Sequence, residues 1–197
     1  MKCGGIVLCG GLSSRMGQPK AWLPFGTELL LPRVVRILRE VVDPIVAVAA
    51  PGQSLPPLPA DVEIIYDREE GLGPLNGLAS GLAALLNRVD AVYLSSCDVP
   101  FLRPEFVRRI IETLGEGDIA IPKAEGYLHP LAAVYRVRVL PTVRRLLDSG
   151  CRRLQALTDE VPTRIVEAHE LEGIASLCNL NSPADYEAAL KALREDP

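Results

Sequence analysis

Residues 8–20 have the sequence LCGGLSSRMGQPK, and this stretch decides which fold class the rest of the chain must fit. It continues the apolar run 5–9, which predicts a buried β-strand. Glycines allow the backbone to approach a phosphate closely, and their N–H groups can line an anion-binding concavity. Arg15 and Lys20 add positive charge, and Lys20 is one of only four lysines in the chain. We therefore predict a phosphate-binding loop that follows the first strand.

Two common kinds of phosphate loop do not fit this stretch. A Walker A loop needs Ser or Thr after its lysine, but Lys20 lies between a proline and an alanine. A dinucleotide loop needs the spacing G-x-G-x-x-G, but the glycines here occupy positions 10, 11 and 17. The stretch instead resembles the L-x-G-G-x-S-x-R-M-G-x-x-K signature of nucleotidyltransferases with a Rossmann-like α/β fold. Those enzymes transfer a nucleoside monophosphate from an NTP to a phosphorylated acceptor.

The rest of the chain alternates between strand-like and helix-like segments. Further strands are predicted at 45–49, 62–66, 92–96, 118–121, 131–135 and 164–166. Helices are predicted at 30–38, 75–86, 104–114, 137–147 and 183–194. This alternation predicts a three-layer α/β fold with a mostly parallel central sheet, formed by residues 1–197 as a single domain. In such folds ligands bind beyond the carboxyl ends of the strands.

The composition limits the classes of ligand that we expect and indicates a cellular compartment. The chain is 48% hydrophobic and has a formal net charge of −4, which argues against disorder and against a nucleic-acid surface. No apolar stretch is long enough to span a membrane, and the N-terminus lacks a signal-peptide pattern. The five cysteines show no C-x-x-C spacing, so neither a disulfide framework nor a zinc site is indicated. We expect a reduced cytoplasmic protein with a small anionic ligand and with no nucleic-acid or membrane partner.

The fourth predicted strand ends at the sequence SSCDVP, residues 95–100. An aspartate at this point would project its carboxylate into the ligand crevice, and Mg²⁺ prefers one or two carboxylates together with phosphate oxygens. Asp98 is therefore a candidate metal ligand, although Asp-x-Pro also occurs in ordinary turns. Cys9 and Cys97 are expected to be buried as small apolar residues.

Other polar residues follow other predicted strands. Asp67 ends the third strand and could accept hydrogen bonds from a ribose or a base, or could cap a turn. His129 precedes a proline and a strand, where it could contact the phosphate of an acceptor or form a hydrogen bond within its loop. The run Asn179-Leu180-Asn181-Ser182-Pro183 leads into the last helix, and Asn181 or Ser182 can cap that helix. Capping does not account for Asn179.

Taken together, these motifs are similar to those of molybdenum cofactor guanylyltransferases, which join GMP from GTP to molybdopterin with release of pyrophosphate. The similarity follows the family's order: Leu8-x-Gly10-Gly11, Arg15-Met16-Gly17, Lys20, Gly73-Pro74-Leu75-x-Gly77, Cys97-Asp98-x-Pro100, His129-Pro130 and Asn179-x-Asn181-Ser182-Pro183. Molybdenum cofactor cytidylyltransferases share part of the first motif. They usually have Ala-Ala-Gly at positions 9–11, glycine at position 97 and aspartates at positions 179 and 181, so this chain is closer to the guanylyl enzymes.

The resemblance implies a role for each matching residue. Leu8, Cys9, Gly10 and Gly11 would bind the guanine through backbone groups, Asp67 would bind the nucleoside, Lys20 the triphosphate, and Asp98 both the nucleotide and Mg²⁺. Acceptor-binding candidates are Arg15, Gly77, Asn179 and Asn181, with Arg15 also helping to neutralise charge during transfer. Molybdoenzymes or cofactor-delivery proteins are further partners that the resemblance implies.

Two departures and three alternatives accompany this hypothesis. Pro19 replaces an aspartate that often precedes the signature lysine, and residues 46–50 lack an asparagine thought to contact the nucleotide. A cytidylyltransferase, another small-acceptor nucleotidyltransferase and a non-enzymatic nucleotide-binding protein remain as alternatives.

Because Arg15 and Lys20 carry like charge, loss of Lys20 is expected to leave stability unchanged or slightly improved.

Overall fold

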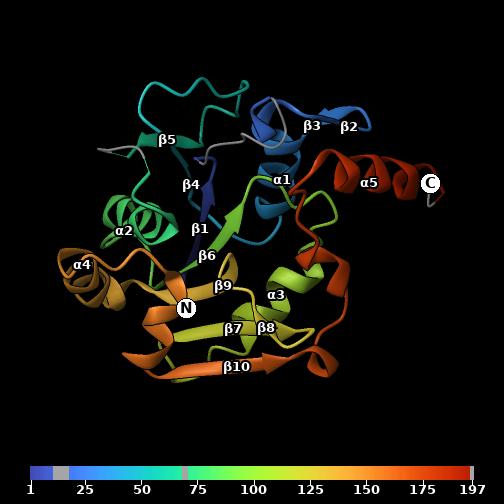
Figure 1. Ribbon diagram of the computed structural model, residues 1–197. Coiled ribbons are helices and arrows are strands. Elements are labelled where there is room, and N and C mark those ends of the chain that lie inside the picture. Colours follow the sequence, from blue (N-terminus) through green and yellow to red (C-terminus); the bar gives the residue numbers. More distant parts are fainter. Residues whose placement is uncertain (11–17, 68–70, 196–197) are drawn as a thin grey trace.

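The structure is a computed structural model that describes residues 1–10, 18–67 and 71–195. Its centre is a sheet whose strands lie in the order β10-β7-β9-β6-β1-β4-β5, with the short β8 added beside β7. The strands of this sheet are β1 (Cys3–Leu8), β4 (Ile45–Ala49), β5 (Glu63–Tyr66), β6 (Ala91–Ser96), β7 (Ile119–Ala124), β8 (Tyr127–Leu128), β9 (Ala132–Arg136) and β10 (Thr163–Glu167). All neighbouring pairs are parallel except those of β9 with β6 and β7 and of β8 with β7. The predicted mostly parallel α/β sheet is therefore confirmed (Figure 1).

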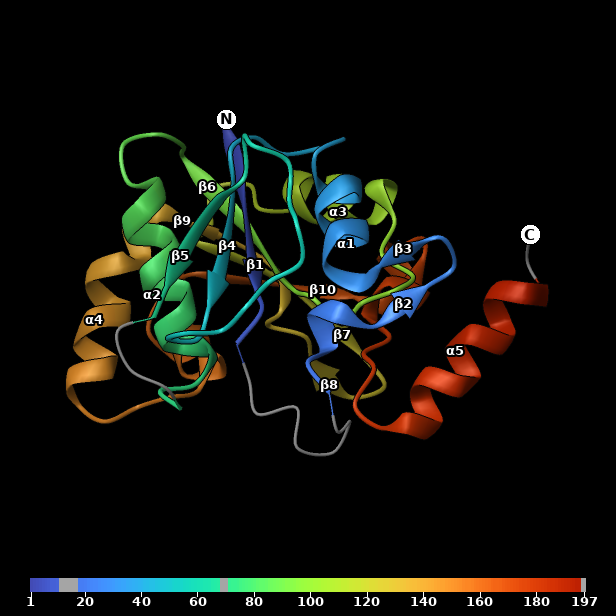
Figure 2. The ribbon, with the colours of Figure 1, turned by 90° about the horizontal axis from the view of Figure 1, so that it is seen from above.

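Helices cover both faces of the sheet and make it the middle of three layers (Figure 2). The helices of the protein are α1 (Leu30–Leu38), α2 (Pro74–Leu85), α3 (Pro104–Glu112), α4 (Leu140–Asp148) and α5 (Pro183–Glu195). Apolar side chains of α1 and α3 pack on one face, and those of α2 and α4 pack on the other. The central strands are buried on both faces, which explains why β1 and β4 consist almost entirely of apolar residues.

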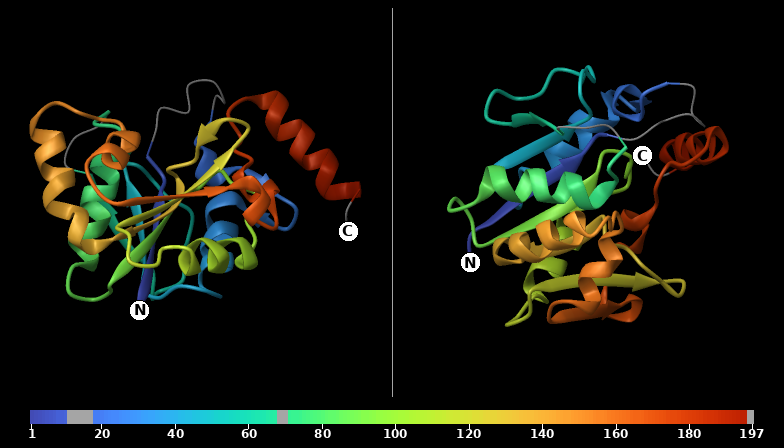
Figure 3. Two further views of the ribbon diagram at one scale, coloured as in Figure 1. Left: turned by 90° about the horizontal axis from the view of Figure 1, so that it is seen from below. Right: turned by 60° about the vertical axis from the view of Figure 1, so that its left-hand side comes forward.

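A third apolar cluster lies to one side of these layers. Helix α5 projects from the body of the protein and packs against the two-stranded ribbon of β2 (Pro24–Phe25) and β3 (Glu28–Leu29) (Figure 3). The buried members of this third apolar cluster are Leu23, Phe25, Leu30, Leu180 and Ala189. The cluster thus joins the chain just after Lys20 to the chain just before Asn181.

Every predicted strand and helix is present, with shifts of at most three residues at its ends. The predicted helix 137–147 is a 3₁₀ turn at Val137–Val139 followed by α4. The β2–β3 ribbon and several 3₁₀ turns carry no periodic signal strong enough to predict, because each is only two to six residues long. Within the described part of the chain, no helix combines the length and the apolar character needed to cross a bilayer.

Close packing of α2 on β1 depends on two glycines. A Cβ at Gly81 would lie 2.6 Å from Ile6 Cδ1, and a Cβ at Gly77 would lie 2.9 Å from Leu8 Cδ2. The absence of these methyl groups lets the helix approach the strand that leads to the phosphate loop.

We expect Gly81→Ala to lower the free energy of unfolding by about 1–3 kcal/mol, because overpacking against Ile6 exceeds the gain of about 1 kcal/mol from the higher helix propensity of alanine. Urea unfolding followed by circular dichroism measures this change. Ala83→Ser, on the exposed face of the same helix, is the matched control and should change stability by less than about 0.5 kcal/mol. A stabilised Gly81→Ala variant would contradict the packing argument.

Candidate functional site

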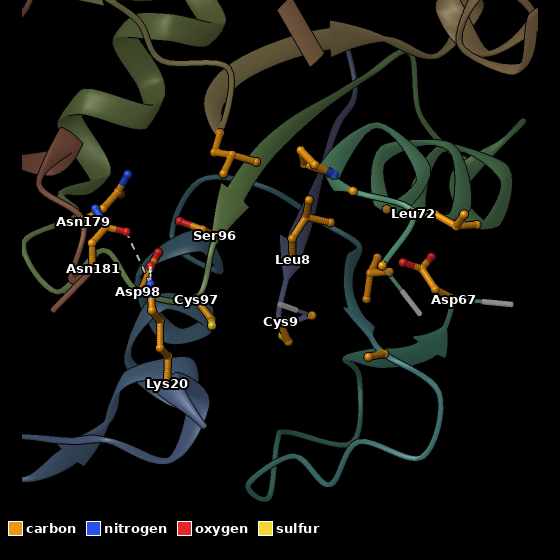
Figure 4. A pocket seen from close by; sticks show the side chains of 18 residues that line it. Leu8, Cys9, Lys20, Asp67, Leu72, Ser96, Cys97, Asp98, Asn179 and Asn181 are labelled. Carbon is orange, nitrogen blue, oxygen red and sulfur yellow. Dashed lines mark hydrogen bonds and ion pairs between the residues drawn. The ribbon is translucent and has the colours of Figure 1, made fainter. Parts of the chain in front are cut away.

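A cavity of about 430 Å³ opens at the carboxyl ends of β1, β4, β5 and β6. Strands β4 and β5 follow β1 on one side and β6 lies on the other, so the cavity occupies the point where the strand order reverses. The start of α2, the 3₁₀ turn at Lys20–Trp22 and residues 179–181 complete its wall. The predicted site residues that line it are Leu8, Cys9, Gly10, Lys20, Asp67, Gly77, Asp98, Asn179 and Asn181 (Figure 4). The two other predicted residues, Gly11 and Arg15, lie outside the described residues.

An ion pair between Lys20 and Asp98 lies at one end of this cavity. Lys20 Nζ is 2.6 Å from Asp98 Oδ2 and 3.5 Å from Asn181 Oδ1. The side chains are only 21% and 11% exposed, so solvent screens the pair weakly. Removal of Lys20 would leave a largely buried carboxylate without this cation. From this geometry we expect the loss of Lys20 to lower stability, in contrast to the expectation from the sequence alone.

Two polar atoms of the cavity wall have no hydrogen-bond partner among the described residues. Ser96 Oγ and Asp98 Oδ1 are both buried and both unpaired. Buried polar atoms are nearly always hydrogen-bonded, so unpaired ones that line a cavity are suited to contact a ligand. Among the described residues, no cluster of three or more His, Cys, Asp or Glu side chains could hold a metal by itself. A divalent ion beside Asp98 would thus take further oxygen ligands from a phosphate or from water, as Mg²⁺ does.

The start of α5 holds Asn181 in place. Asp185 Oδ2 accepts hydrogen bonds from the N–H of Asn181 (2.9 Å) and from that of Ser182 (2.8 Å). Ser182 Oγ accepts in return the N–H of Asp185 at 3.2 Å. The N–H of Leu180 donates to the backbone carbonyl of Asp98 at 3.0 Å. Segment 179–181 is thereby attached to the end of β6 on one side and to α5 on the other. The predicted capping role of Ser182 is confirmed, and the sequence spacing S-x-x-D could have indicated Asp185 as well.

Gln53 connects the ends of β1 and β4 beside the cavity. Its Nε2 donates to the carbonyl of Cys9 at 2.9 Å, and its Oε1 accepts the N–H of Ala50 at 2.9 Å. The N–H of Cys9 donates to Val48 O at 2.8 Å, so both backbone groups of Cys9 are already hydrogen-bonded. Gly10, the next residue, makes no backbone hydrogen bond within the described part of the chain. The sequence showed no asparagine after β4, and a loop glutamine gives no signal by which this contact could have been predicted.

Asp67 lines the opposite end of the cavity from Asp98 (Figure 4). Ser80 Oγ of α2 donates to Asp67 Oδ1 at 2.6 Å, which orients the carboxylate. Gly73 has φ +78° directly before α2, and a Cβ there would lie 3.1 Å from Arg152 O, so the turn that shapes this wall requires glycine.

Cys9 and Cys97 both line the cavity, and both are buried. Interaction with the Cys97 thiol, together with burial, raises the pKa of Cys9 well above its ordinary value, and the Cys9 thiol donates to Val7 O at 3.6 Å. A thiol in this state is protonated at neutral pH and is a poor nucleophile. The prediction that both cysteines are buried apolar residues is confirmed.

A strand-end cavity at the point of strand reversal, with a lysine, two carboxylates and two asparagines in its wall, is typical of a nucleotide-binding α/β protein. Residues 5–164 match the family model of the MobA-like NTP transferase domain, and the chain belongs to that family.

Similar proteins agree with this assignment over nearly the whole chain. A probable molybdenum cofactor guanylyltransferase of Carboxydothermus hydrogenoformans is 33% identical over 193 residues, which is 94% of this chain and 93% of that protein. One from Mycobacterium avium is 37% identical over 198 residues, covering 98% of this chain and 97% of the relative. Among solved structures, molybdopterin-guanine dinucleotide biosynthesis protein A of Archaeoglobus fulgidus superposes with a TM-score of 0.79. The match covers 99% of this chain and 100% of the Archaeoglobus protein. At 22% sequence identity, it shows that the two proteins share a fold.

We expect the Asp185 carboxylate to stabilise the protein in a pH-dependent way. Hydrogen bonds, first that from the N–H of Asn181, lower the pKa of Asp185 below its ordinary value of 3.8. Its contribution is therefore complete above the ordinary pKa and is lost as the pH falls through the lowered value of the folded state. The difference in unfolding free energy between wild type and Asp185→Asn should be largest near neutral pH and shrink below about pH 4, as measured by urea unfolding.

Glu187→Gln is the matched control, because Glu187 is exposed on the same helix and makes no hydrogen bond or ion pair with a described residue. The difference for this control should not show the same decline. A constant difference for Asp185→Asn across the whole pH range would contradict the capping assignment.

Proposed function

We propose that this protein transfers GMP from GTP to molybdopterin and releases pyrophosphate. The observation that carries the proposal is the convergence of nine predicted site residues on one cavity. The proposal is supported by relatives of 33–37% identity that are named as probable molybdenum cofactor guanylyltransferases. The chain covers more than nine-tenths of each of these relatives.

In this proposal, guanine binds at the end of β1. The backbone groups of Cys9 are already engaged, so Gly10 offers the N–H and C=O that can form new hydrogen bonds to a base. Gln53 holds the preceding peptide and thereby sets the direction of the Gly10 groups. Asp67, oriented by Ser80, accepts hydrogen bonds from the nucleoside.

The triphosphate binds at the other end of the cavity, beside Lys20 and Asp98. Lys20 Nζ contributes positive charge to the phosphates, and the unpaired Oδ1 of Asp98 is available to a metal ion. A bound Mg²⁺ would neutralise phosphate charge and hold the triphosphate in line with its acceptor. Asn181, 3.5 Å from Lys20, fixes the lysine within reach of the same phosphates.

The acceptor phosphate enters past Asn179 and Asn181 and attacks the α-phosphorus of GTP. A bond forms between the acceptor oxygen and the α-phosphorus, and the bond from that phosphorus to the pyrophosphate oxygen breaks. The attacking phosphate is already anionic, so no strong general base is needed. Catalysis then depends on the alignment of the acceptor with the α-phosphorus and on charge neutralisation by Lys20 and a bound Mg²⁺.

We expect a preference for GTP over CTP of about 10- to 1,000-fold in kcat/KM, because a base that leaves buried partners unpaired loses about 1–3 kcal/mol of binding. Pyrophosphate release with molybdopterin as acceptor measures the ratio. Gln53→Glu should reduce it, since a carboxylate cannot donate to the carbonyl of Cys9. Equal turnover with CTP would favour the cytidylyl alternative.

Lys20→Ala should lower kcat/KM for GTP by about 10²–10³-fold, the usual effect of removing one donor that acts on developing charge. Asp98→Asn should nearly abolish turnover, because an amide is a poor ligand for Mg²⁺.

Lys20→Ala should also lower the free energy of unfolding by about 1–3 kcal/mol, between the values for exposed and buried ion pairs.

The double variant Lys20→Ala/Asp98→Asn serves as the control for stability, because it removes the buried charge together with its partner. It should recover part of the stability lost in Lys20→Ala. Wild-type kinetics of either single variant would refute the assigned roles.

A further inference from the structure

A second cavity, of about 290 Å³, adjoins the first one. The two cavities share Pro74, Leu131 and Asn179 in their walls, so Asn179 faces both. This volume approaches the lower end of the range for small-molecule sites, about 300–1,000 Å³. A ligand whose phosphate lies at Asn179 can therefore extend from the first cavity into the second.

The second cavity contains a buried histidine nitrogen with no partner. Among the described residues, four buried side-chain polar atoms lack a hydrogen-bond partner, and three of them belong to residues that line one of the two cavities. Ser96 and Asp98 line the first, and His129 lines the second through its unpaired Nε2. Unpaired buried polar atoms are costly, so their concentration in the two cavities marks both as ligand sites.

The backbone around His129 is firmly held. Its N–H donates to Pro122 O at 2.8 Å, and its carbonyl accepts the N–H of Ala132 at 3.0 Å. Tyr135 Oη donates to the carbonyl of Pro130 at 2.7 Å. The imidazole is thus positioned by the sheet edge, although its Nε2 takes no part in this network. This arrangement does not fit the alternative in which the His129 side chain merely closes its own loop.

The remaining walls define the chemistry of the ligand. They are mainly apolar, with Val99, Leu154 and Leu177 buried at 3%, 2% and 8% exposure, and Gln155 lies exposed at the rim. Apolar walls with few polar groups suit a flat heterocycle that has hydrogen-bonding atoms on its edge.

We propose that this second cavity binds the pterin ring of the acceptor, with His129 Nε2 and Gln155 recognising the polar edge of the ring. The inference rests on the proposed function for the identity of the acceptor. It assigns to this chain a pterin subsite separate from the nucleotide cavity, with Asn179 at the boundary between the two.

The test uses pterin itself, 2-amino-4-oxopteridine, which has no phosphate and undergoes no transfer. Its binding to the full chain is followed by fluorescence, with and without saturating GTP and Mg²⁺. We expect saturable binding whose Kd changes less than about twofold on adding GTP, because the sites are separate. His129→Phe should weaken binding by about 10-fold or more, in keeping with the loss of a buried hydrogen bond. Gln155→Ala, at the exposed rim, should weaken it by a smaller factor and cannot disturb the core.

His169→Phe is the matched control, because His169 is the other histidine of the chain and is exposed in the 3₁₀ turn Ala168–Glu170. It should bind pterin as the wild type does. Displacement of pterin by GTP, a Kd indifferent to both His129→Phe and Gln155→Ala, or no saturable binding up to the solubility limit would overturn the subsite.

The subsite and the proposed function can fail separately. His129-dependent pterin binding without GMP transfer to molybdopterin would retain the subsite and refute the function. GMP transfer in which His129→Phe leaves the KM for molybdopterin unchanged would retain the function and refute the subsite. If both hold, His129→Phe should raise the KM for molybdopterin by about 10-fold and leave that for GTP unchanged.

Discussion

The parallel pairing of β1 with β6 is the constraint on which the site depends. Leu8 lies opposite Ser96 in this pairing, and the N–H of Cys97 donates to Leu8 O at 3.1 Å. The residues after the two strands, Gly10 and Asp98, therefore both line the cavity although 88 positions separate them in the chain. A shift of this register by one residue would turn each side chain of the strand to the other face of the sheet and would change the burial of Asp98. Packing of α2 on β1 through Gly77 and Gly81 stabilises the strand in this position.

A second constraint brings the remaining charged and amide groups to the same place. Helix α5 and the β2–β3 ribbon form their own apolar cluster outside the three layers. Because Lys20 precedes this cluster in the chain and Asn181 follows Leu180 within it, their side chains meet beside Asp98. The cluster is small, and only one of its five buried members, Ala189, belongs to α5, so the geometry of this end of the cavity relies on specific hydrogen bonds. The Asp185 carboxylate and the N–H of Leu180 form these hydrogen bonds.

The cavity wall combines strong anchoring with a few unsatisfied atoms. Gln53, Ser80 and Asp185 each use their polar groups to hold a residue of the wall, and only Asp185 falls in a spacing that the sequence could have indicated. In contrast, Ser96 Oγ, Asp98 Oδ1 and His129 Nε2 have no partner in the described part of the protein. Anchoring costs little when each donor meets an acceptor, whereas an unpaired buried atom is costly, and one that lines a cavity is suited to contact a ligand. The division between the two groups separates the residues that support the site from those suited to contact a ligand.

The amino-acid sequence by itself determined the fold class, the order of strands and helices and nine of the residues around the cavity. Periodicity, the glycine-rich loop and the short motifs that resemble those of a known family are local properties, so they can be recognised without knowledge of long-range contacts. The tertiary structure alone decided the antiparallel insertion of β9, the Lys20–Asp98 ion pair and the contacts of Gln53 and Ser80. It also decided that a second cavity lies under His129. These features depend on which distant segments pack together, and hydrogen bonds between residues 13 to 78 positions apart leave no periodic pattern in the sequence.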